Sequence, residues 1–559
     1  MSGIEDQLPA DQHDYLEQLQ FSRRRFFELA LLAGASYLVS ACTTSSPTSA
    51  PARTSEQPTS PVSSTPARTS ELPTTLASST PEQLNEQDFL HQAANSLLDL
   101  HAEGEAGWRF QSQIQAPHYQ TDRDVGAASV GMGFLVMDKQ EPHDPRWLDA
   151  ANKTADWLMA VSKQDNHGGR FWPDYSDDAE VSQDVYTSFD DGAIGIGDFF
   201  WQLYERTQDA KHQEMAVASL EWTFSRAENI GKGENIYRWQ WNANDNQSPY
   251  YMGMGEGAVG TIHTLTSYYE RLKNTNPAQV KMCKTYIDGS LRYLDMVRQA
   301  LDNNSGDGRA IPETGVIGQD GDTTMNSGYL SGAAGAAFMY LKLYQVFGDK
   351  NYLTKADELF SWLEDAKQGP LVDFGDGTAA WKLSLDPQGG DNPIFATGME
   401  EGNAGIGWTY LQAYNLIKQE KYLVMAKKAA DWLLKVALKD RQGGLSWHED
   451  ESPVNPLIHA NLNNGAAGIG MFLEDLYQAT NDPKYHQASQ GALNWITASA
   501  ARDGNDIYWN DNGGEAAYSK DPSWHWGTAG ILAFVARMHG GTIDIAGEQP
   551  GLPSRLAKA

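Results

Sequence analysis

The sequence predicts an all-α protein, an (α/α)7 toroid of seven helical hairpins with short extended segments between the outer and inner helices. Three observations predict this fold: a sevenfold internal repeat, an apolar helix after each copy, and an aromatic-marked helix before it. One helical hairpin cannot bury both of its faces alone, so neighbouring hairpins must pack on one another. Because neither end carries an obvious polar capping unit, a closed ring is favoured over an open solenoid.

The repeat is a polar or small pair, then Gly-x-x-Gly, then an apolar helix. After Gly405, for example, Ile406, Tyr410 and Tyr414 fall on one helical face. Glycine at the helix start permits close packing where many helix ends meet. The copies are placed by their first glycine, with an alanine standing in for it in the first copy: Ala128, Gly192, Gly257, Gly332, Gly402, Gly465 and Gly527.

Aromatic residues mark the other two parts of each unit. The outer helices carry Trp157, Trp222, Tyr293, Trp362, Trp432 and Trp495, which we interpret as hairpin core. The extended pieces carry Trp108, Phe171 and Trp172, Trp239 and Trp241, Trp381, Trp447, and Trp509. The fourth unit has Ile311-Pro312 there instead. It also contains an insertion at residues 303–327, rich in Gly and Asp, which forms either a lid or a long loop.

The N-terminus predicts export. Residues 1–41 fit a twin-arginine-type lipoprotein signal peptide, with Ser22-Arg23-Arg24-Arg25 before a short apolar run that ends at the lipidation candidate Cys42. Residues 42–83 form a Ser/Thr/Pro-rich disordered tether. The toroid then takes residues 84–540, and residues 541–559 form a C-terminal tail. We therefore expect a lipoprotein on the extracytoplasmic face of a bacterial membrane.

The formal net charge of −31 limits the partners. No cluster of Lys and Arg follows Arg25, so nucleic acid is not an expected partner. The membrane is expected to be reached only through the N-terminal lipid, and the chain is expected to be a monomer. With Cys42 lipidated, Cys283 is the one remaining cysteine, which leaves no intramolecular disulfide.

Seven such Gly-x-x-Gly units resemble the lanthionine synthetase C-like family, a seven-hairpin α/α toroid; six-hairpin glycosidases and sugar epimerases share the general architecture. In the family's zinc-dependent cyclases, the ligands are a Cys before the fifth repeat glycine and a Cys-His pair before the sixth. Here those positions hold Glu400, Glu401, Asn463 and Asn464. Zinc sites of that kind need thiolate or imidazole donors. The resemblance therefore implies the fold, with no zinc and no lanthionine cyclisation.

Polar residues just before each repeat glycine are expected to surround the mouth of the ring. One explanation is helix capping, which suits Asp191, Ser331 and Asn464. The other is an acidic centre in which one carboxyl stays protonated and another ionised, as an acid/base pair of the glycosidase kind requires. The catalytic candidates are Asp190, Asp191, Glu256, Glu400, Glu401 and His525.

Aromatic residues in polar settings suit stacking on sugar rings, although the same composition suits peptides. The substrate-binding candidates are Trp172, Trp241, Trp447, Trp509, Trp524, Asn463 and Asn464. No cofactor is expected; the alternative is a Ca²⁺ ion held by the oxygens of Glu400, Glu401, Asn463 and Asn464.

Three hypotheses about function follow. The first is a zinc-independent carbohydrate-active enzyme, a hydrolase working through the mouth carboxylates. The second is a divergent lanthionine synthetase C-like protein that modifies or binds a peptide. The third is a noncatalytic lipoprotein that binds a glycan or another solute.

Overall fold

The computed structural model describes residues 86–104, 106–111, 119–174, 184–304, 306–315, 324–385, 394–450, 457–509 and 520–540. All of them belong to one compact unit, Pro81–Ala559. The predicted signal peptide, the tether with Cys42, the C-terminal tail and residues 316–323 of the insertion lie outside the described residues. No helix in the described part of the chain is long and apolar enough to cross a membrane.

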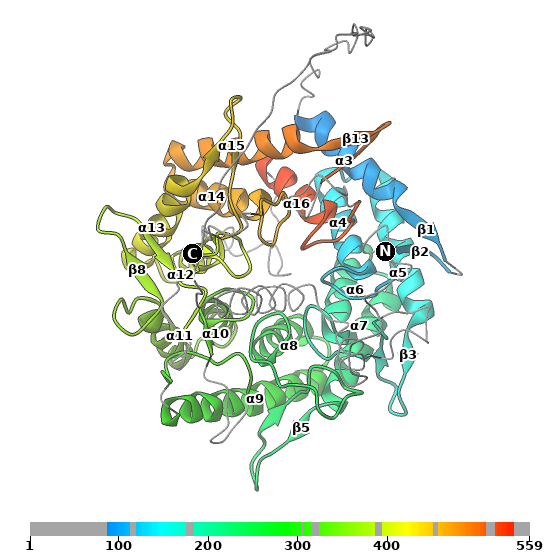
Figure 1. The fold of residues 1–559 in the computed structure, drawn as a ribbon. Helices are drawn as coiled ribbons and strands as arrows, with labels where there is room; N and C mark the ends of the chain where they lie inside the picture. Colours follow the sequence, from blue (N-terminus) through cyan, green and yellow to red (C-terminus); the bar gives the residue numbers. More distant parts are fainter. Residues whose placement is uncertain are drawn as a thin grey trace, which may run out of the picture. The chain divides into compact units, whose positions relative to one another are not determined.

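Seven inner helices follow the seven repeat copies and form a ring (Figure 1). Their first turns are rich in Ala and Gly, and nearly every side chain of their first ten residues is buried. They are α4 (Ala127–Gln140), α6 (Ala193–Thr207), α8 (Ala258–Leu272), α10 (Ala333–Phe347), α12 (Asn403–Ile417), α14 (Ala466–Thr480) and α16 (Thr528–Met538).

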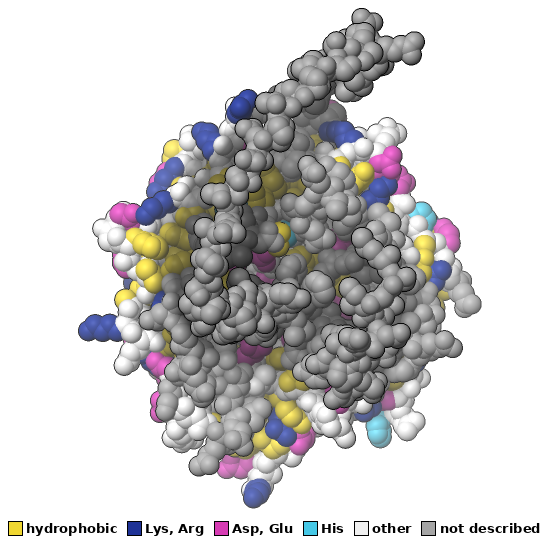
Figure 2. Space-filling model, viewed as in Figure 1, with side chains coloured by type: hydrophobic (Ala, Val, Ile, Leu, Met, Phe, Trp, Pro, Cys, Tyr) yellow, Lys and Arg dark blue, Asp and Glu magenta, His cyan; other side chains and the backbone are white. Residues whose placement is uncertain are grey.

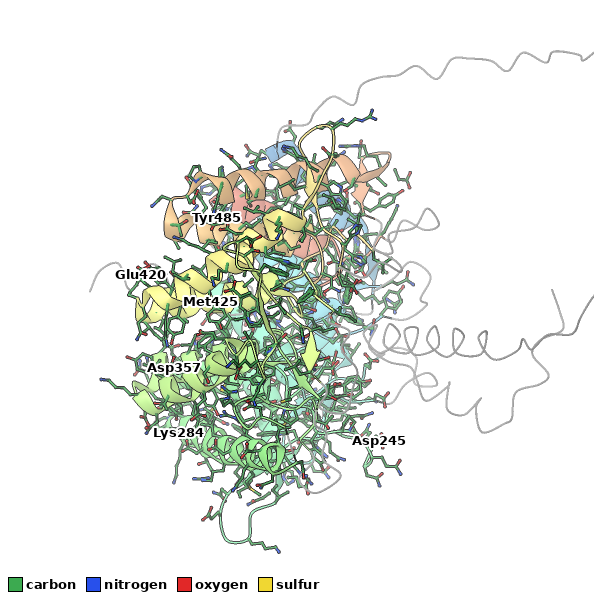
Figure 3. The ribbon with its side chains drawn as sticks, turned by 60° about the vertical axis from the view of Figure 1, so that its left-hand side comes forward. Asp245, Lys284, Asp357, Glu420, Met425 and Tyr485 are labelled. Carbon is green, nitrogen blue, oxygen red and sulfur yellow. The ribbon has the colours of Figure 1, made fainter. Side chains whose placement is uncertain are left out.

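Seven outer helices pack around the inner ring, and Figure 3 labels side chains from four of them, α9, α11, α13 and α15. Five outer helices begin at an Asp or Asn whose side chain accepts a backbone N–H of the first turn, a favourable cap. They are α3 (Glu86–Asp99), α5 (Pro145–Val161), α7 (Ala210–Ser225), α9 (Pro277–Asn303), α11 (Lys350–Leu363), α13 (Glu420–Val436) and α15 (Pro483–Ser499).

The ring is closed, as the sequence predicts, because the last inner helix α16 packs on the first, α4. The first helix of the described residues, α3, covers α16 from outside and completes its hairpin. The Ile507 N–H donates to Ser96 Oγ at 2.8 Å, and the Phe89 ring meets the edge of Trp509. An open solenoid is therefore wrong: residues about 410 positions apart hold the two ends together.

Short antiparallel β-hairpins stand between outer and inner helices in six units. The fourth unit differs, as its Ile311-Pro312 sequence suggests: β7 (Met325–Asn326) there pairs with β10 (Ser384–Leu385) of the next unit. The hairpins are β1 (His101–Glu103) with β2 (Trp108–Phe110), β3 (Lys163–Gln164) with β4 (Arg170–Phe171), β5 (Glu228–Asn229) with β6 (Tyr237–Arg238), β8 (Leu371–Asp373) with β9 (Ala379–Trp381), β11 (Leu438–Lys439) with β12 (Leu445–Ser446), and β13 (Ala501–Asp503) with β14 (Asp506–Tyr508).

The repeat glycines mark places where the backbone comes too close for a side chain. A Cβ on Gly405, the second glycine of the fifth unit, would lie 1.8 Å from the Met399 carbonyl oxygen. The second glycine of the sixth unit, Gly468, meets the Leu462 carbonyl in the same way, at 2.0 Å. The loop before each inner helix thus folds back onto the first helical turn, and this contact fixes the loops that surround the ring axis.

Candidate active site

The first unit is out of register in the sequence prediction. The inner helices begin after an N-cap glycine, and in the first unit that glycine is Gly126, so the alignment on Ala128 is wrong by two residues. The correct alignment puts Asp124 and Arg123 at the positions of Asp190 and Phe189 in the second unit. We call the four residues before each N-cap glycine a mouth loop.

Helix capping does not explain the polar residues of the mouth loops. The caps are the glycines themselves, and none of the inner helices has a side-chain cap hydrogen bond. The capping interpretation of Asp191, Ser331 and Asn464 is therefore wrong. Their side chains turn to other partners: Ser331 Oγ donates to Glu401, and Asn464 Nδ2 donates to Glu449 Oε1 at 2.6 Å.

Backbone hydrogen bonds join successive mouth loops around the axis. In each link, a backbone N–H of one mouth loop donates to a backbone carbonyl of the next mouth loop. The accepting residue stands two positions before the N-cap glycine of its unit. Examples are Arg123 N to Asp190 O at 2.9 Å and Leu330 N to Glu400 O at 2.7 Å. The Asn463 N–H donates to His525 O at 3.0 Å. This belt fixes each mouth residue relative to its neighbours.

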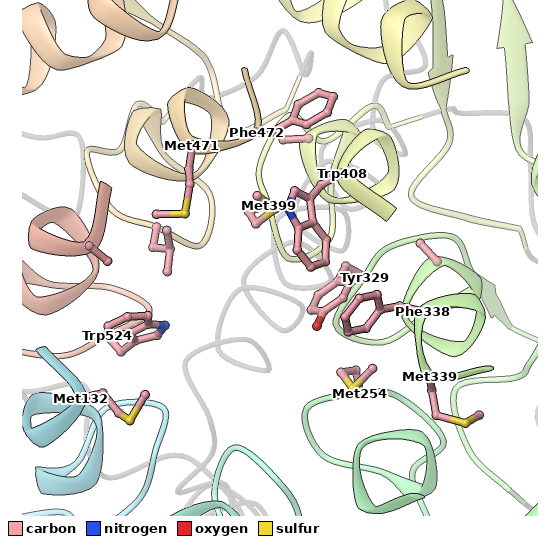
Figure 4. Close-up of a cluster of buried hydrophobic side chains, with 14 of the residues drawn as sticks. Met132, Met254, Tyr329, Phe338, Met339, Met399, Trp408, Met471, Phe472 and Trp524 are labelled. Carbon is pink, nitrogen blue, oxygen red and sulfur yellow. The ribbon is translucent and has the colours of Figure 1, made fainter. Parts of the chain in front are cut away.

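The residues three before each N-cap glycine converge on the axis. One from every unit lines a cavity of about 30 Å³, and four of them are labelled in Figure 4. Asp190, Glu400 and His525, two before their glycines, line the same cavity, which we call the axial cavity. The seven converging residues are Arg123, Phe189, Met254, Tyr329, Met399, Leu462 and Trp524.

His525 stands between two carboxylates. Its Nδ1 lies 2.9 Å from Asp124 Oδ1 and 3.0 Å from Glu400 Oε1. Burial alone would lower the pKa of His525, but the charge of Glu400, the hydrogen bond to Asp124 and the charge of Asp190 raise it well above the ordinary value. His525 is therefore an imidazolium at neutral pH, paired with Asp124 and Glu400.

Asp190 also lines the axial cavity. Burial raises its pKa to about 6, and Asp124 and Glu400 add to the shift, while His525 and Arg123 oppose it. Arg123 Nη1 lies 3.9 Å from Asp190 Oδ1, and its guanidinium lies over the Phe189 ring. The Asp190 carboxyl therefore titrates close to neutral pH.

The surroundings of Asp191 raise the pKa of its carboxyl group and fix the orientation of that group. Burial raises its pKa well above the ordinary value, and repulsion from Glu256 and Asp124 adds to the shift. The indole N–H of Trp241 donates to Asp191 Oδ2 at 2.9 Å, which fixes the orientation of the carboxyl group. Burial and this repulsion therefore favour the protonated form of the Asp191 carboxyl.

An aromatic cluster separate from the main core lies beside Asp191. The rings of Trp241 and Tyr186 stack at 4.4 Å between centroids, and Tyr251 meets Trp241 edge-on. Trp241 thus contacts the acidic mouth through Asp191, and its role in substrate binding stays a prediction. Figure 2 shows acidic side chains near the middle of the face in view.

Three of the other predicted substrate-binding indoles lie elsewhere. Trp172, Trp447 and Trp509 are buried, and each donates its N–H to a carbonyl at the end of the preceding outer helix, at 2.7 to 2.9 Å. Trp239 and Trp381 do the same. These tryptophans fasten the extended pieces to the outer helices and have no open ring face, so they do not enter the proposed site.

Three of the four residues suggested for Ca²⁺ have separate partners. Glu400 pairs with His525, Glu401 with Ser331, and Asn464 with Glu449. Asn463 is buried beside them in the belt. Among the described residues, no group of three or more His, Cys, Asp and Glu side chains is arranged to hold a metal ion. No cation site is proposed there.

The geometry defines a class of protein: a closed α/α toroid with an acidic mouth on its axis. Residues 388–545 match the model of the lanthionine synthetase C-like protein family. The resemblance predicted from the repeat is therefore confirmed over that part of the chain. No curated protein matches the sequence.

Solved structures with similar folds span most of the toroid at low identity. A nisin cyclase is 12% identical, with a TM-score of 0.47, and covers 81% of this chain and 93% of its own. A GH76 alpha-mannanase of Bacteroides thetaiotaomicron is 13% identical, with a TM-score of 0.44, covering 82% and 96%. A D-mannose isomerase is 13% identical, with a TM-score of 0.45, covering 81% and 97%. Their activities are not transferred to this chain.

Proposed function

We propose that the protein is a zinc-independent carbohydrate-active enzyme of the glycoside hydrolase kind. The observation that carries this proposal is the contrast between two carboxyl groups of one mouth. Burial and repulsion favour the protonated form of Asp191, whereas Glu400 Oε1 lies 3.0 Å from Nδ1 of the His525 imidazole. Carboxyl groups held in opposite states supply the acid and the anionic partner that glycoside hydrolysis needs.

Each group has a role in this proposal. Asp191 donates a proton from Oδ1 to the glycosidic oxygen, and Trp241 keeps its carboxyl group oriented. Glu256 maintains the protonated state of Asp191 by repulsion. Glu400 takes a proton from the water that attacks the anomeric carbon, so the bond to water forms as the bond to the leaving sugar breaks, and His525 with Asp124 holds Glu400 in place.

A glycan hydrolysis screen on the purified chain tests the proposal. Wild type is expected to hydrolyse at least one glycan, and Glu400→Gln is expected to lower kcat by at least about 100-fold. Asp349→Asn, which replaces the N-cap of α11 by an equally good cap, serves as the control with unchanged turnover. Equal turnover by wild type and Glu400→Gln would remove Glu400 from the reaction, and the absence of any hydrolysis would leave the noncatalytic binding hypothesis.

A second candidate function rests on the family match over residues 388–545, which favours a peptide substrate. In this alternative the mouth binds or modifies a peptide without the family's zinc thiolates. Binding or modification of a dehydrated Cys-containing peptide by the purified protein, with no hydrolysis of any glycan, would support it and contradict the carbohydrate proposal.

We also propose that the chain is exported and tethered by lipid at Cys42. The support is the order of Ser22-Arg23-Arg24-Arg25, the apolar run and the cysteine. Metabolic labelling with a palmitate analogue is expected to label the wild type but not Cys42→Ser, and Arg23→Lys with Arg24→Lys is expected to retain the precursor in the cytoplasm. Labelling of Cys42→Ser would contradict the assignment.

A further inference from the structure

The axial cavity presents buried hydrogen-bond donors that have no partner among the described residues. They are the Trp524 indole N–H and the Arg123 Nε and Nη2, on side chains that are each 2% exposed. Both residues line the cavity, and in Figure 4 the indole nitrogen of Trp524 points towards the middle of the ring. Asp198 Oδ2, at 4.0 Å from Arg123 Nε, is too far away for a hydrogen bond.

Such donors indicate a group that fills the cavity. A buried N–H without an acceptor is costly, and the Trp524 indole together with the Arg123 guanidinium forms a site for an acceptor atom. About 30 Å³ gives room for about two water-sized groups, so the occupant is small or is the tip of a larger molecule.

The surrounding charges decide what kind of acceptor fits. Asp190 and Glu400 lie on the wall, Asp124 behind His525, and Asp198 behind Arg123, where Arg271 also pairs with it. These four carboxyl groups outnumber the three cations Arg123, Arg271 and His525, so an anion is disfavoured. A cation would face three N–H groups. A neutral hydroxyl group fits the N–H donors and the carboxylates together, because it accepts a hydrogen bond from an N–H and donates one to a carboxylate.

We propose that the axial cavity is the innermost subsite of the mouth and takes a hydroxyl group of a neutral sugar. The hydroxyl accepts hydrogen bonds from Trp524 Nε1 and Arg123 and donates one to Asp190. This inference rests on the proposed function for its substrate class and sharpens it, because the subsite selects neutral sugars over uronic acids.

Calorimetric titration of monosaccharides tests the subsite. The probes are glucose, mannose and galactose with their matched uronic acids, titrated into wild type, Trp524→Phe and Trp381→Phe. Trp524→Phe keeps an aromatic ring and removes the N–H. Trp381→Phe is the matched control, because its N–H donates to Leu363 O outside the mouth. At least one neutral sugar is expected to bind, and its uronic acid is expected to bind at least about tenfold more weakly.

For that neutral sugar, Trp524→Phe is expected to raise Kd about five- to tenfold, the effect of one lost hydrogen bond, with no change in Trp381→Phe. Equal or tighter binding of the uronic acid, an unchanged Kd in Trp524→Phe, or no binding of any neutral sugar would each overturn the subsite.

A glycan hydrolysis assay beside the titration separates this inference from the proposed function. A protein that binds neutral sugars through Trp524 but hydrolyses no glycan keeps the subsite and loses the enzyme. A protein that hydrolyses glycans with an unchanged KM in Trp524→Phe keeps the enzyme and loses the subsite.

Discussion

His525 Nδ1 lies 2.9 Å from Asp124 Oδ1, and this contact joins the last unit of the ring to the first. Backbone hydrogen bonds link the mouth loops from the first unit to the seventh, whereas side chains make this last connection. Glu400 of the fifth unit meets the same nitrogen at 3.0 Å. His525 is therefore part of the ring closure and of the candidate active site at once.

Replacing His525 by Gln is expected to lower the free energy of unfolding by about 3 kcal/mol, because two buried carboxylates lose their cation. Urea unfolding at pH 6.5 measures it. His101→Gln is the control: its Nε2 lies 3.5 Å from Glu103 Oε1, but that carboxylate is 76% exposed, so the loss is expected to stay below about 1 kcal/mol. Equal losses in the two variants would contradict a buried ion pair at the mouth.

The stabilisation by His525 has a defined pH dependence. Its pKa is raised on folding, so the folded state binds the proton more tightly than the unfolded state does. The contribution is fully present below the unfolded pKa of about 6.5 and is lost as pH rises through the higher folded pKa. The stability difference between wild type and His525→Gln is therefore expected to shrink on going to alkaline pH. Growth of that difference with pH would show that His525 is neutral.

Glu256→Gln is expected to shift the pH profile of catalysis. Repulsion from Glu256 helps to raise the pKa of Asp191, so its removal lowers that pKa. The general acid must be protonated, and activity therefore falls as pH rises through the pKa of Asp191. In profiles of kcat/KM, the alkaline limb is expected to move to lower pH by about one unit in Glu256→Gln. An unmoved limb would show that another group is the acid.

Gly405→Ala is expected to destabilise the fold by about 3 kcal/mol, since the new Cβ would lie 1.8 Å from the Met399 carbonyl oxygen. Gly348→Asn is the control. Gly348 has a left-handed φ of 71° with open space around it, and Asn481 holds the same place after α14 with a φ of 54°. Thermal unfolding is expected to show a large loss for the first variant and nearly none for the second. Similar losses would mean that backbone conformation, not close packing, fixes the repeat glycine.

The sequence predicts the ring because each repeat glycine marks a place where the backbone packs too closely for a side chain. The carbonyl of Met399 on Gly405 has counterparts in other units, so the glycine spacing reports where inner helices begin. The first unit lacks the second glycine and has Ser129 there, which led to the two-residue error. That error hid Asp124, although the sequence Asp122-Arg123-Asp124-Val125-Gly126 matches Ser188-Phe189-Asp190-Asp191-Gly192 once Gly126 is taken as the start.

The roles of the tryptophans depend on contacts that the sequence does not record. Trp447 and Trp241 both follow short extended pieces and both stand among polar residues. Only the fold separates them: the N–H of Trp447 reaches Leu433 O at the end of α13, and that of Trp241 reaches Asp191 in the mouth. A Trp that follows a last-turn residue by 13 to 18 positions in five of the seven outer helices is the signal for the structural role.

The most direct test of the central claim compares Asp191→Asn with wild type on two substrates, a natural glycan that the wild type cleaves and an aryl glycoside of the same sugar with a strongly acidic phenol. Loss of a general acid matters only when the leaving group needs a proton. We predict that Asp191→Asn lowers kcat at least about 100-fold on the glycan and less than about tenfold on the aryl glycoside. Equal losses on the two substrates, or none on the glycan, would contradict the assignment of Asp191 as the acid.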